Sequence, residues 1–406
     1  MPGLLFWFFV IIILYTYLGY PLILSLLAMS RAVRKPGKVD DQGVSLPSLT
    51  LLIAAYNEEE IIAEKLENSL KLDYPPSCLQ ILVAADGSDD RTVEIVSSFR
   101  DRGVELSYFP ARDGKSPAIN RALLAARGDL VVFSDANNFY EPQALRELVG
   151  HFVDPGVAVV TGAKTILEGD GNLGDSEGLY WKYESFIKKQ ESRLGTCTGV
   201  VGEILAIRRN LIEPIPDNII NDDFYLAMRV IKKGFRVVYA SGARSVERVS
   251  ASAQAEVTRR RRIVAGRYQA MTHARNLLPW NRPLVVWQVA SHKFLRPLVP
   301  FAMIGALVTN VITVVFPPTF IGTSLFRLTA PWNLLLLAAQ LLFYFAAWIG
   351  NKMENRGNRW KFLYLPAFLV NSNLAALRGF YLYVSKQQTN RWKRVQRRSA
   401  SETEVL

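Results

Sequence analysis

The feature that most restricts how this chain can fold is a long N-terminal segment without a charged side chain. Residues 4–29 are mostly apolar, and the segment is longer than the roughly 20 residues that cross a bilayer as a helix. A cleaved signal peptide would begin with basic residues, which this segment lacks. Basic residues follow it instead, at Arg31, Arg34, Lys35 and Lys38, which predicts that the next part of the chain is cytoplasmic.

The C-terminal part contains further apolar segments. Residues 298–316 and 331–350 each predict a membrane span, and residues 361–385 predict a weaker third. Polar residues interrupt this last segment, and at such a depth they face protein or a water-filled path: Asn371, Asn373 and Arg378. Three spans after a cytoplasmic domain would place the basic C-terminal end outside, against the positive-inside tendency. Either the last segment does not cross fully or this chain breaks the rule.

The net charge of +12 arises in two segments beside apolar ones. Residues 259–296 hold nine Lys or Arg and no acid, and residues 386–398 hold six and no acid. A nucleic-acid-binding protein usually spreads its positive charge over the folded domain, so we expect membrane contact and no nucleic-acid partner. The only cysteines, Cys78 and Cys197, exclude a disulfide framework and a cysteine zinc site, and two thiols fit a cytoplasmic location.

Between the membrane segments, short apolar runs alternate with segments of helical spacing. The runs predict strands at residues 49–54, 80–85, 104–109 and 130–134, and helices at 58–71, 90–100, 116–126 and 141–152. This alternation indicates a mostly parallel sheet with both faces covered, in which ligands bind beyond the carboxyl ends of the strands. Acidic and amide side chains follow three of the runs. No GxGxxG or GxxxxGK[ST] motif is present, which argues against dinucleotide and P-loop sites.

Several motifs occur in a characteristic order along this middle part. They are Ala54-Ala55-Tyr56-Asn57-Glu58, Asp86-Gly87-Ser88-x-Asp90, Gly114-Lys115-x-x-Ala118-x-Asn120, Ser134-Asp135-Ala136-Asn137, Asn221-Asp222-Asp223 and the RRRRIVAG run at 259–266. In this order they resemble the family 2 glycosyltransferases, especially the membrane-embedded inverting enzymes related to cellulose, hyaluronan and poly-N-acetylglucosamine synthases. The resemblance covers residues 49–269, and the membrane segments agree only in layout. It implies an α/β GT-A domain, Rossmann-like with a mostly parallel sheet, accompanied by transmembrane α-helices.

The resemblance also implies a site for a nucleotide sugar, expected to be UDP-linked. Asp86 would bind the uracil, and Lys115 would face the negative charges of the diphosphate. A turn followed by a helix N-cap at Ser88 or Asp89 is a competing explanation of the DGSDD sequence, and it is compatible with binding. The residues implied in this site are Ala55, Tyr56, Asn57, Glu58, Asp86, Ser88, Lys115, Asp135 and Arg262.

The sequence Asp135-Ala136-Asn137 takes the place of the family's DxD motif. The resemblance therefore implies that Asp135 and Asn137 bind a divalent metal, Mg²⁺ or Mn²⁺, which neutralises charge as UDP departs. Asn137 departs from the family pattern, because an amide oxygen can bind a hard cation but brings no charge. We therefore do not expect the protein alone to bind the metal tightly. A helix cap competes as an explanation of Asn138, but it explains Asp135 poorly.

The acidic pair at 222–223 aligns with the TED motif of the family, whose last aspartate is the general base. Asp223 would take the proton of the acceptor hydroxyl. A neighbouring carboxylate disfavours ionisation, so Asp222 would make Asp223 a stronger base. A helix N-cap is the competing explanation for the pair. Gly199 and Gly202 match the loop that approaches the acceptor.

The arginine run takes the place of the family's QxxRW motif. The resemblance implies that Arg262 contacts the diphosphate, and that Ile263 replaces the tryptophan that contacts the acceptor sugar. Attraction to lipid headgroups is the competing explanation, and we expect it for the other arginines. Ile263 has no flat ring to stack on a sugar, which favours addition of one or a few sugars. The polar residues in 361–385 favour a glycan channel instead.

The sequence thus predicts an inverting glycosyltransferase that acts on a lipid-linked or growing glycan. We expect it in the cell (inner or plasma) membrane, multi-pass, with a cytoplasmic catalytic domain. The expected domains are an N-terminal transmembrane helix (1–30), a GT-A domain (47–248), basic interfacial helices (249–297), C-terminal transmembrane helices (298–385) and a basic tail (386–406). Two alternatives stay open: a processive polysaccharide synthase that secretes a homopolymer, and a catalytically inactive partner subunit.

Overall fold

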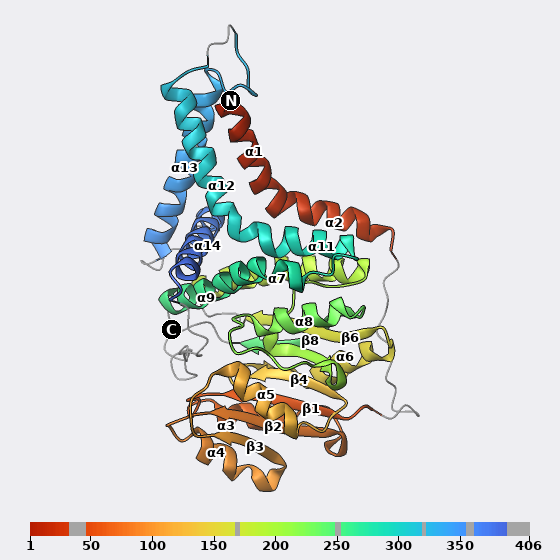
Figure 1. Ribbon diagram of the computed structural model, residues 1–406. Coiled ribbons are helices and arrows are strands. Elements are labelled where there is room, and N and C mark those ends of the chain that lie inside the picture. The colour runs from red at the N-terminus through yellow and green to blue at the C-terminus, as the bar shows by residue number, and fades with distance from the viewer. Residues whose placement is uncertain (32–45, 167–170, 248–252, 319–321, 355–360, 388–406) are drawn as a thin grey trace. The chain divides into compact units, whose positions relative to one another are not determined.

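The protein is described by a computed structural model that divides into two compact units (Figure 1). The structure describes residues 1–31, 46–166, 171–247, 253–318, 322–354 and 361–387. The sheet unit comprises Leu24–Glu256 and Gln269–Gln288, and the helical unit comprises Met1–Ile23, Val257–Tyr268 and Val289–Gln387. Arg34, Lys35, Lys38 and the predicted basic tail after residue 387 lie outside the described residues.

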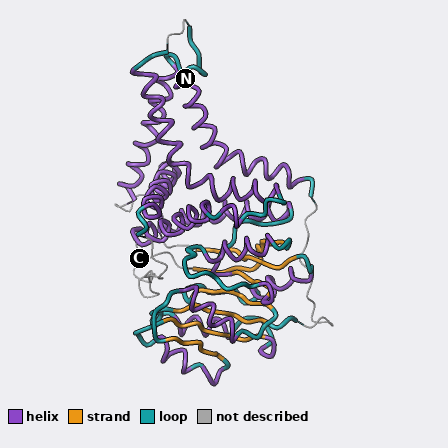
Figure 2. Tube along the Cα trace, viewed as in Figure 1, coloured by secondary structure: helices purple, strands orange, loops and turns teal. Residues whose placement is uncertain are grey.

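The sheet unit is built on a sheet whose strands are orange in Figure 2. The sheet has eight strands in the order β3-β2-β1-β4-β7-β6-β8-β5. β3, β2, β1 and β4 are parallel, as predicted, whereas β7 runs antiparallel to β4 and β6. β8 is parallel to β6 and antiparallel to β5. The strands are β1 Leu49–Ala55, β2 Leu79–Asp86, β3 Val104–Phe109, β4 Leu130–Asp135, β5 Phe139–Tyr140, β6 Val157–Ile166, β7 Leu205–Arg208 and β8 Arg236–Glu247.

Helices pack on this sheet because its central strands are apolar on both faces. Every residue of β1 is buried. Leu51 and Ile53 belong to the core that also contains Ile62 and Leu66 of α3, and α5 packs on β1, β2 and β3. The helices of this unit are α3 Ile62–Leu70, α4 Thr92–Ser98, α5 Lys115–Ala125, α6 Ala144–Val149, α7 Gly171–Leu194, α8 Asp222–Lys232, α10 Ala274–Leu277 and α11 Pro283–Val289.

The strand register brings the polar strand ends to one edge of the sheet. Ala54 of β1 lies opposite Asp135 of β4, and Ala55 lies opposite Ala85 of β2. Asp86, the last residue of β2, lies opposite Phe109 of β3. The sequences that follow β1, β2 and β4 therefore leave the sheet side by side, as the parallel order requires.

The helical unit contains α1 Pro2–Leu14, α12 Leu295–Val315, α13 Trp332–Glu354, α14 Lys361–Val384 and the central part of α9, which runs over Ala253–Thr272. α2, Tyr20–Met29, continues the N-terminal helix beyond a π-helical turn at Tyr15–Gly19. Small residues allow close helix contacts here, since a Cβ on Gly305 of α12 would lie 2.5 Å from the Phe9 ring of α1.

Three helical stretches in the described part of the chain are long and apolar enough to cross a membrane: Pro2–Met29, Pro283–Val315 and Trp332–Met353. They contain most of the three stronger predicted spans. The weaker predicted segment, 361–385, does form the helix α14, but it is not among these three stretches.

Two asparagines of α14 form hydrogen bonds with side chains of other helical segments. Asn371 and Asn351 of α13 exchange amide hydrogen bonds of 3.0 and 2.8 Å. Asn373 donates to the hydroxyl of Tyr17 at 3.1 Å and to the carbonyl of Leu369 at 2.8 Å. Packing between helices therefore accounts for both asparagines, and a glycan channel is not needed to explain them.

Candidate active site

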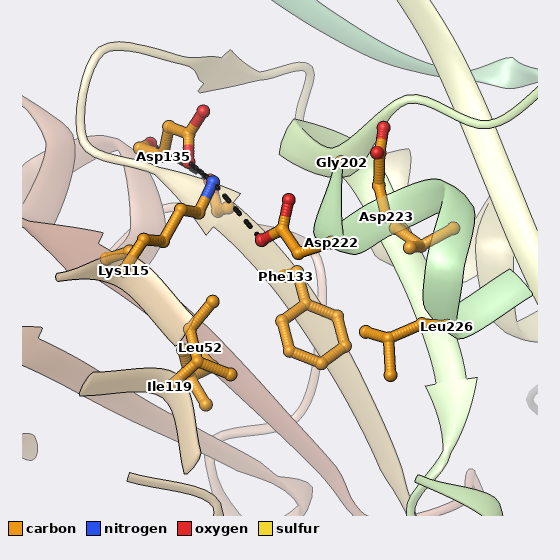
Figure 3. A pocket seen from close by; sticks show the side chains of 12 residues that line it. Leu52, Lys115, Ile119, Phe133, Asp135, Gly202, Asp222, Asp223 and Leu226 are labelled. Atoms are coloured by element: carbon orange, nitrogen blue, oxygen red, sulfur yellow. Dashed lines mark hydrogen bonds and ion pairs between the residues drawn. The ribbon is translucent and has the colours of Figure 1, made fainter. Parts of the chain in front are cut away.

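A pocket lies at the edge where β1 and β4 end (Figure 3). Its floor is apolar, formed by side chains from β1, β4, β7, α5 and α8. Its charged lining consists of three carboxylates and one ammonium group, from Asp135, Asp222, Asp223 and Lys115. Sequence reasoning placed all four in the site, and the structure brings them together.

The Lys115 ammonium lies between two of these carboxylates. Its Nζ is 2.7 Å from Oδ1 of Asp135 and 3.9 Å from Oδ2 of Asp222. Lys115 is the first residue of α5, directly after Gly114, whose φ of 115° is a conformation that side chains rarely adopt. The three side chains are between 19% and 26% exposed, so the cluster is only partly screened by solvent.

The two aspartates at the start of α8 point to different partners. Asp222 is directed toward Lys115, whereas Asp223 lies beside Gly202 (Figure 3). A Cβ added to Gly202 would be 3.1 Å from Cβ and 3.4 Å from Cγ of Asp223, so a larger residue would displace Asp223. Asn221 stands at the N-cap position without a side-chain cap bond. Asp222 is therefore an ion-pair partner of Lys115. Its effect on the basicity of Asp223 stays a prediction.

The segment before α8 is held by two amide side chains. Asn120 of α5 donates to the carbonyl of Ile215 at 2.8 Å and accepts its N–H at 2.9 Å. Gln269 donates to the carbonyl of Asn218 at 2.6 Å and accepts the N–H of Ile220 at 3.0 Å. These reciprocal hydrogen bonds fix the backbone that precedes Asp222 and Asp223. Asn120 was noticed in a motif, and Gln269 was missed.

The predicted nucleotide-site residues after β1 and β2 couple two loops. The Asn57 side chain donates to Oδ1 of Asp89 at 2.5 Å, and its backbone N–H donates to Oγ of Ser88 at 3.2 Å. The N–H of Glu58 donates to Oγ1 of Thr92 at 2.8 Å.

The alternative prediction of a helix cap by Ser88 or Asp89 is wrong, because α4 begins at Thr92 without a side-chain cap bond.

Asp86 is almost completely buried, with 2% of its surface exposed. Its carboxylate accepts hydrogen bonds from the N–H of Gly114 at 2.6 Å, the N–H of Asp113 at 3.3 Å and the guanidinium of Arg121 at 2.7 Å. Asp86 thereby fixes the backbone that leads into Lys115. Sequence reasoning gave it only a base-binding role and missed this one.

Two arginines stack on aromatic rings at the same edge. The Arg112 guanidinium lies 3.9 Å from the ring centre of Tyr56, which follows Ala55 at the end of β1. The Arg121 guanidinium lies 4.3 Å from the ring centre of Phe109. Such cation–π contacts hold the two guanidinium groups against the rings. Nothing in the sequence alone singled out these arginines.

The loop at 135–138 offers two oxygen donors of the kind that hard cations prefer. These are the carboxylate of Asp135 and the amide oxygen of Asn137. Among the described residues, no group of three or more His, Cys, Asp and Glu is arranged to hold a metal ion. The donors therefore fit a cation that takes its other oxygens from a diphosphate, as Mg²⁺ commonly does. Asn138 donates to Oγ of Ser245 at 3.3 Å and does not cap a helix.

A buried lysine beside this loop was also missed. The Nζ of Lys65 donates to the carbonyl of Asn138 and lies 4.3 Å from the ring centre of Tyr140. Burial lowers the pKa of Lys65 from 10.5 to about 7, although the nearby charge of Asp135 acts in the opposite direction. A sequence signal existed, because Lys65 lies one helical turn from Ile62 and Ser69 on the buried face of α3.

The arginine-run residues lie in α9, in the part that belongs to the helical unit. Arg262 and Ile263 are both half-buried. Arg260 donates to Oγ of Ser372 at 3.0 Å and lies 5.4 Å from the ring centre of Phe368. Arg260 therefore contacts α14, although we expected it to interact mainly with the membrane. The roles of Arg262 toward a diphosphate and of Ile263 toward an acceptor stay predictions.

Residues 50–215 match the family model described as glycosyl transferase family 2. This segment of the sheet unit is thus similar to a family 2 glycosyltransferase domain. It is 30% identical over 220 residues to the "Probable glycosyltransferase YdaM" of Bacillus subtilis (strain 168), which covers 49% of this chain and 50% of that protein. It is 25% identical over 201 residues to the poly-beta-1,6-N-acetyl-D-glucosamine synthase of Staphylococcus aureus (strain COL), covering 48% of each chain. The chain thus spans about half the length of the curated relatives it matches.

Among solved structures, the chain resembles the mannosyltransferase PcManGT from Pyrobaculum calidifontis, determined in complex with GDP-Man and Mn²⁺. The match has a TM-score of 0.66 at 21% identity and covers 93% of this chain and 99% of that one. This likeness supports the predicted GT-A fold. The family match ends at residue 215, before the acidic pair of α8.

The lowered pKa of Lys65 predicts how stability depends on pH. The folded protein holds the Lys65 proton less tightly than the unfolded chain does. The free energy of unfolding should therefore rise with pH between about 7 and 10.5, the two pKa values, by at most about 1.4 kcal/mol per pH unit for one proton. Lys65→Met removes this contribution, so the thermal midpoint of the variant should rise less than that of the wild type between pH 7 and 9.

Thermal unfolding of both proteins across this pH range provides the measurement. Lys71→Met controls for the loss of one positive charge, because Lys71 lies exposed at the end of the same helix. Parallel curves for the wild type and Lys65→Met would contradict the prediction, even if the variant were less stable at every pH.

Proposed function

We propose that this chain is a membrane-bound inverting glycosyltransferase. It transfers one sugar from a nucleoside-diphosphate sugar, UDP-linked in our proposal, to a membrane-associated glycan or lipid-linked acceptor. The observation that carries the proposal is the arrangement of Lys115 between Asp135 and Asp222, with Asp223 beside Gly202. This arrangement puts charges suited to a diphosphate and a separate carboxylate in one pocket.

The chemistry follows from these positions. The acceptor hydroxyl attacks the anomeric carbon from the side opposite the diphosphate, and the bond between that carbon and the diphosphate oxygen breaks. Asp223 takes the proton of the attacking hydroxyl as general base. Lys115 interacts with the negative charge that accumulates on the leaving diphosphate. Asp222 is a poorer choice of base, because its carboxylate lies near the Lys115 ammonium.

A divalent ion, Mg²⁺ or Mn²⁺, would be held by Asp135 and Asn137 together with the diphosphate. When bound, it would supply charge neutralisation for the leaving group. The Mn²⁺ and GDP-Man in the solved mannosyltransferase of similar fold support a metal and a nucleoside-diphosphate sugar for this chain. The name of the Staphylococcus aureus relative supports a glycan product.

The three candidate spans in the described part of the chain support a multi-pass arrangement. Two of them come after most of the sheet unit in the sequence, so a chain that leaves the cytoplasm through one returns through the other. The part of the chain that follows these two spans is then cytoplasmic, which agrees with the positive-inside tendency and the basic C-terminal sequence. This arrangement removes the conflict that a crossing by residues 361–385 would create. The protein is then a multi-pass protein of the cell membrane with a cytoplasmic catalytic domain.

Replacing the proposed base tests the chemistry. Asp223→Asn should lower sugar transfer by about 10²–10⁴-fold, whereas UDP affinity stays close to that of the wild type, because the base contacts the acceptor. UDP release and UDP binding by calorimetry measure the two properties. Asp101→Asn, an exposed substitution outside the pocket, is the control. If Asp223→Asn keeps more than a tenth of the wild-type turnover, Asp223 is not the base.

The metal role is tested by comparing two carboxylates. Asp86→Ala and Asp135→Ala should both weaken UDP binding, but only Asp135→Ala should change how binding depends on the Mg²⁺ or Mn²⁺ concentration. Thermal midpoints identify loss of folding, which matters because Asp86 anchors the backbone before Lys115. Identical metal titrations for the wild type and Asp135→Ala would refute the metal role.

The second candidate function, a processive synthase, differs in product length. Ile263 supplies no aromatic face to hold the newly added sugar, and the asparagines of α14 pair within the helical unit. We therefore expect the purified protein, given one nucleotide sugar, to add one or a few sugars to a lipid-linked acceptor. Mass spectrometry of the products measures their length. Chains of many tens of sugars from this one-component reaction would instead make the protein a polysaccharide synthase.

A further inference from the structure

A buried network of charged side chains joins the loop at 135–138 to the segment that contains Gly202. Nδ2 of Asn137 donates to Oε1 of Glu247 at 3.1 Å. Glu247 forms an ion pair with Lys164, and Nζ of Lys164 is 2.8 Å from Oε1 of Glu203. The side chains of Lys164 and Glu247 are 1% and 3% exposed, and that of Glu203 is 14% exposed.

Neighbouring contacts hold this network in register. Glu247 is the last residue of β8, and Lys164 lies in β6 opposite Ser245, two residues before Glu247. Asn138 also donates to Oγ of Ser245, so both amides of the loop bind β8. Glu203 follows Gly202 directly. The network therefore runs from the proposed metal site to the glycine that allows Asp223 its position.

The hydrogen-bond chemistry explains why residue 137 is an asparagine. An amide offers both a donor, which the Glu247 carboxylate requires, and an oxygen, which a cation can use. An aspartate would offer only oxygens, and would place a third carboxylate beside the single ammonium of Lys164. In a buried environment, the loss of a donor and the addition of a like charge are both costly.

We propose that Asn137 is a positioning residue whose amide group links the proposed metal site, through Glu247 and Lys164, to the Gly202–Glu203 segment beside Asp223. This inference rests on the proposed function for its catalytic consequence. The departure from the DxD pattern is then an adaptation to Glu247. An aspartate at position 137 of this chain would need a hydrogen-bond donor at position 247.

The experiment compares the wild type, Asn137→Asp, Glu247→Gln and the double variant. The double variant keeps the wild-type charge and reverses the donor and the acceptor. Thermal unfolding without nucleotide or metal is one measurement, and sugar transfer is the other. Asn210→Asp, an exposed substitution, controls for the added negative charge.

Asn137→Asp should lower the thermal midpoint by roughly 3–8 °C and sugar transfer by about 10- to 100-fold. The double variant should regain at least half of the lost midpoint, and should transfer sugar at least about tenfold faster than Asn137→Asp, because the amide introduced at position 247 can donate to the carboxylate introduced at position 137. Such recovery is non-additive, as expected for directly interacting residues.

Two results would overturn the inference. One is a double variant in which the losses of thermal midpoint and of sugar transfer equal the combined losses of the two single variants. The other is an Asn137→Asp variant with wild-type stability and higher activity at low metal concentration, which would make Asn137 only a weak metal ligand. If no protein in the series transfers sugar, the proposed function fails, but the unfolding midpoints still decide whether residues 137 and 247 are coupled.

Discussion

The site depends on the register of the parallel strands β2, β1 and β4, whose carboxyl ends meet at one edge of the sheet. At that edge Lys115 lies beside Asp135 and Asp222, and Asp223 lines the same pocket. Three carboxylates and one ammonium do not balance in charge, and they are only partly exposed. Such an arrangement is unfavourable for folding alone, and functional sites are where proteins accept this kind of cost. A ligand that brings both phosphate and a cation fits both kinds of charge in the pocket.

The polar motif residues divide into two groups in the structure. One group faces the pocket, as described above. The other group holds the backbone that positions the first: Asn57 and Ser88 couple two loops, Asp86 fixes the turn before Lys115, and Asn120 holds the segment before α8. A pattern of residues in sequence cannot separate these two groups, because a polar side chain at a strand end can turn toward a ligand or toward the next loop.

The sequence predicted the central strands well, because continuous apolar runs of strand length that alternate with helical segments are typical of a buried parallel sheet. β3 has the predicted bounds, β1 and β4 are one residue longer at the C-terminal end, and β2 is one residue longer at each end. The helix predicted at 58–71 begins only at Ile62, since the N–H groups of Glu58 and Glu59 donate to side chains at the start of α4 and in the loop before it. β5, β6, β7 and β8 were not predicted. β5 and β7 have only two and four residues, and β8 contains charged residues and a glycine. Their places are set by pairing with distant strands.

The four charged pocket residues were predictable by resemblance, whereas the buried lysines that support them were not. Lys65 and Lys164 look like ordinary lysines in sequence, and only their partners, Asn138 and Glu247, identify them. The same limit applies to Asn137. In the sequence it resembles a weakened metal ligand, which an inactive partner subunit would also show. In the structure its N–H has a specific buried acceptor that an aspartate would repel. The departure from the motif therefore does not argue for loss of activity, because the surrounding residues are matched to it.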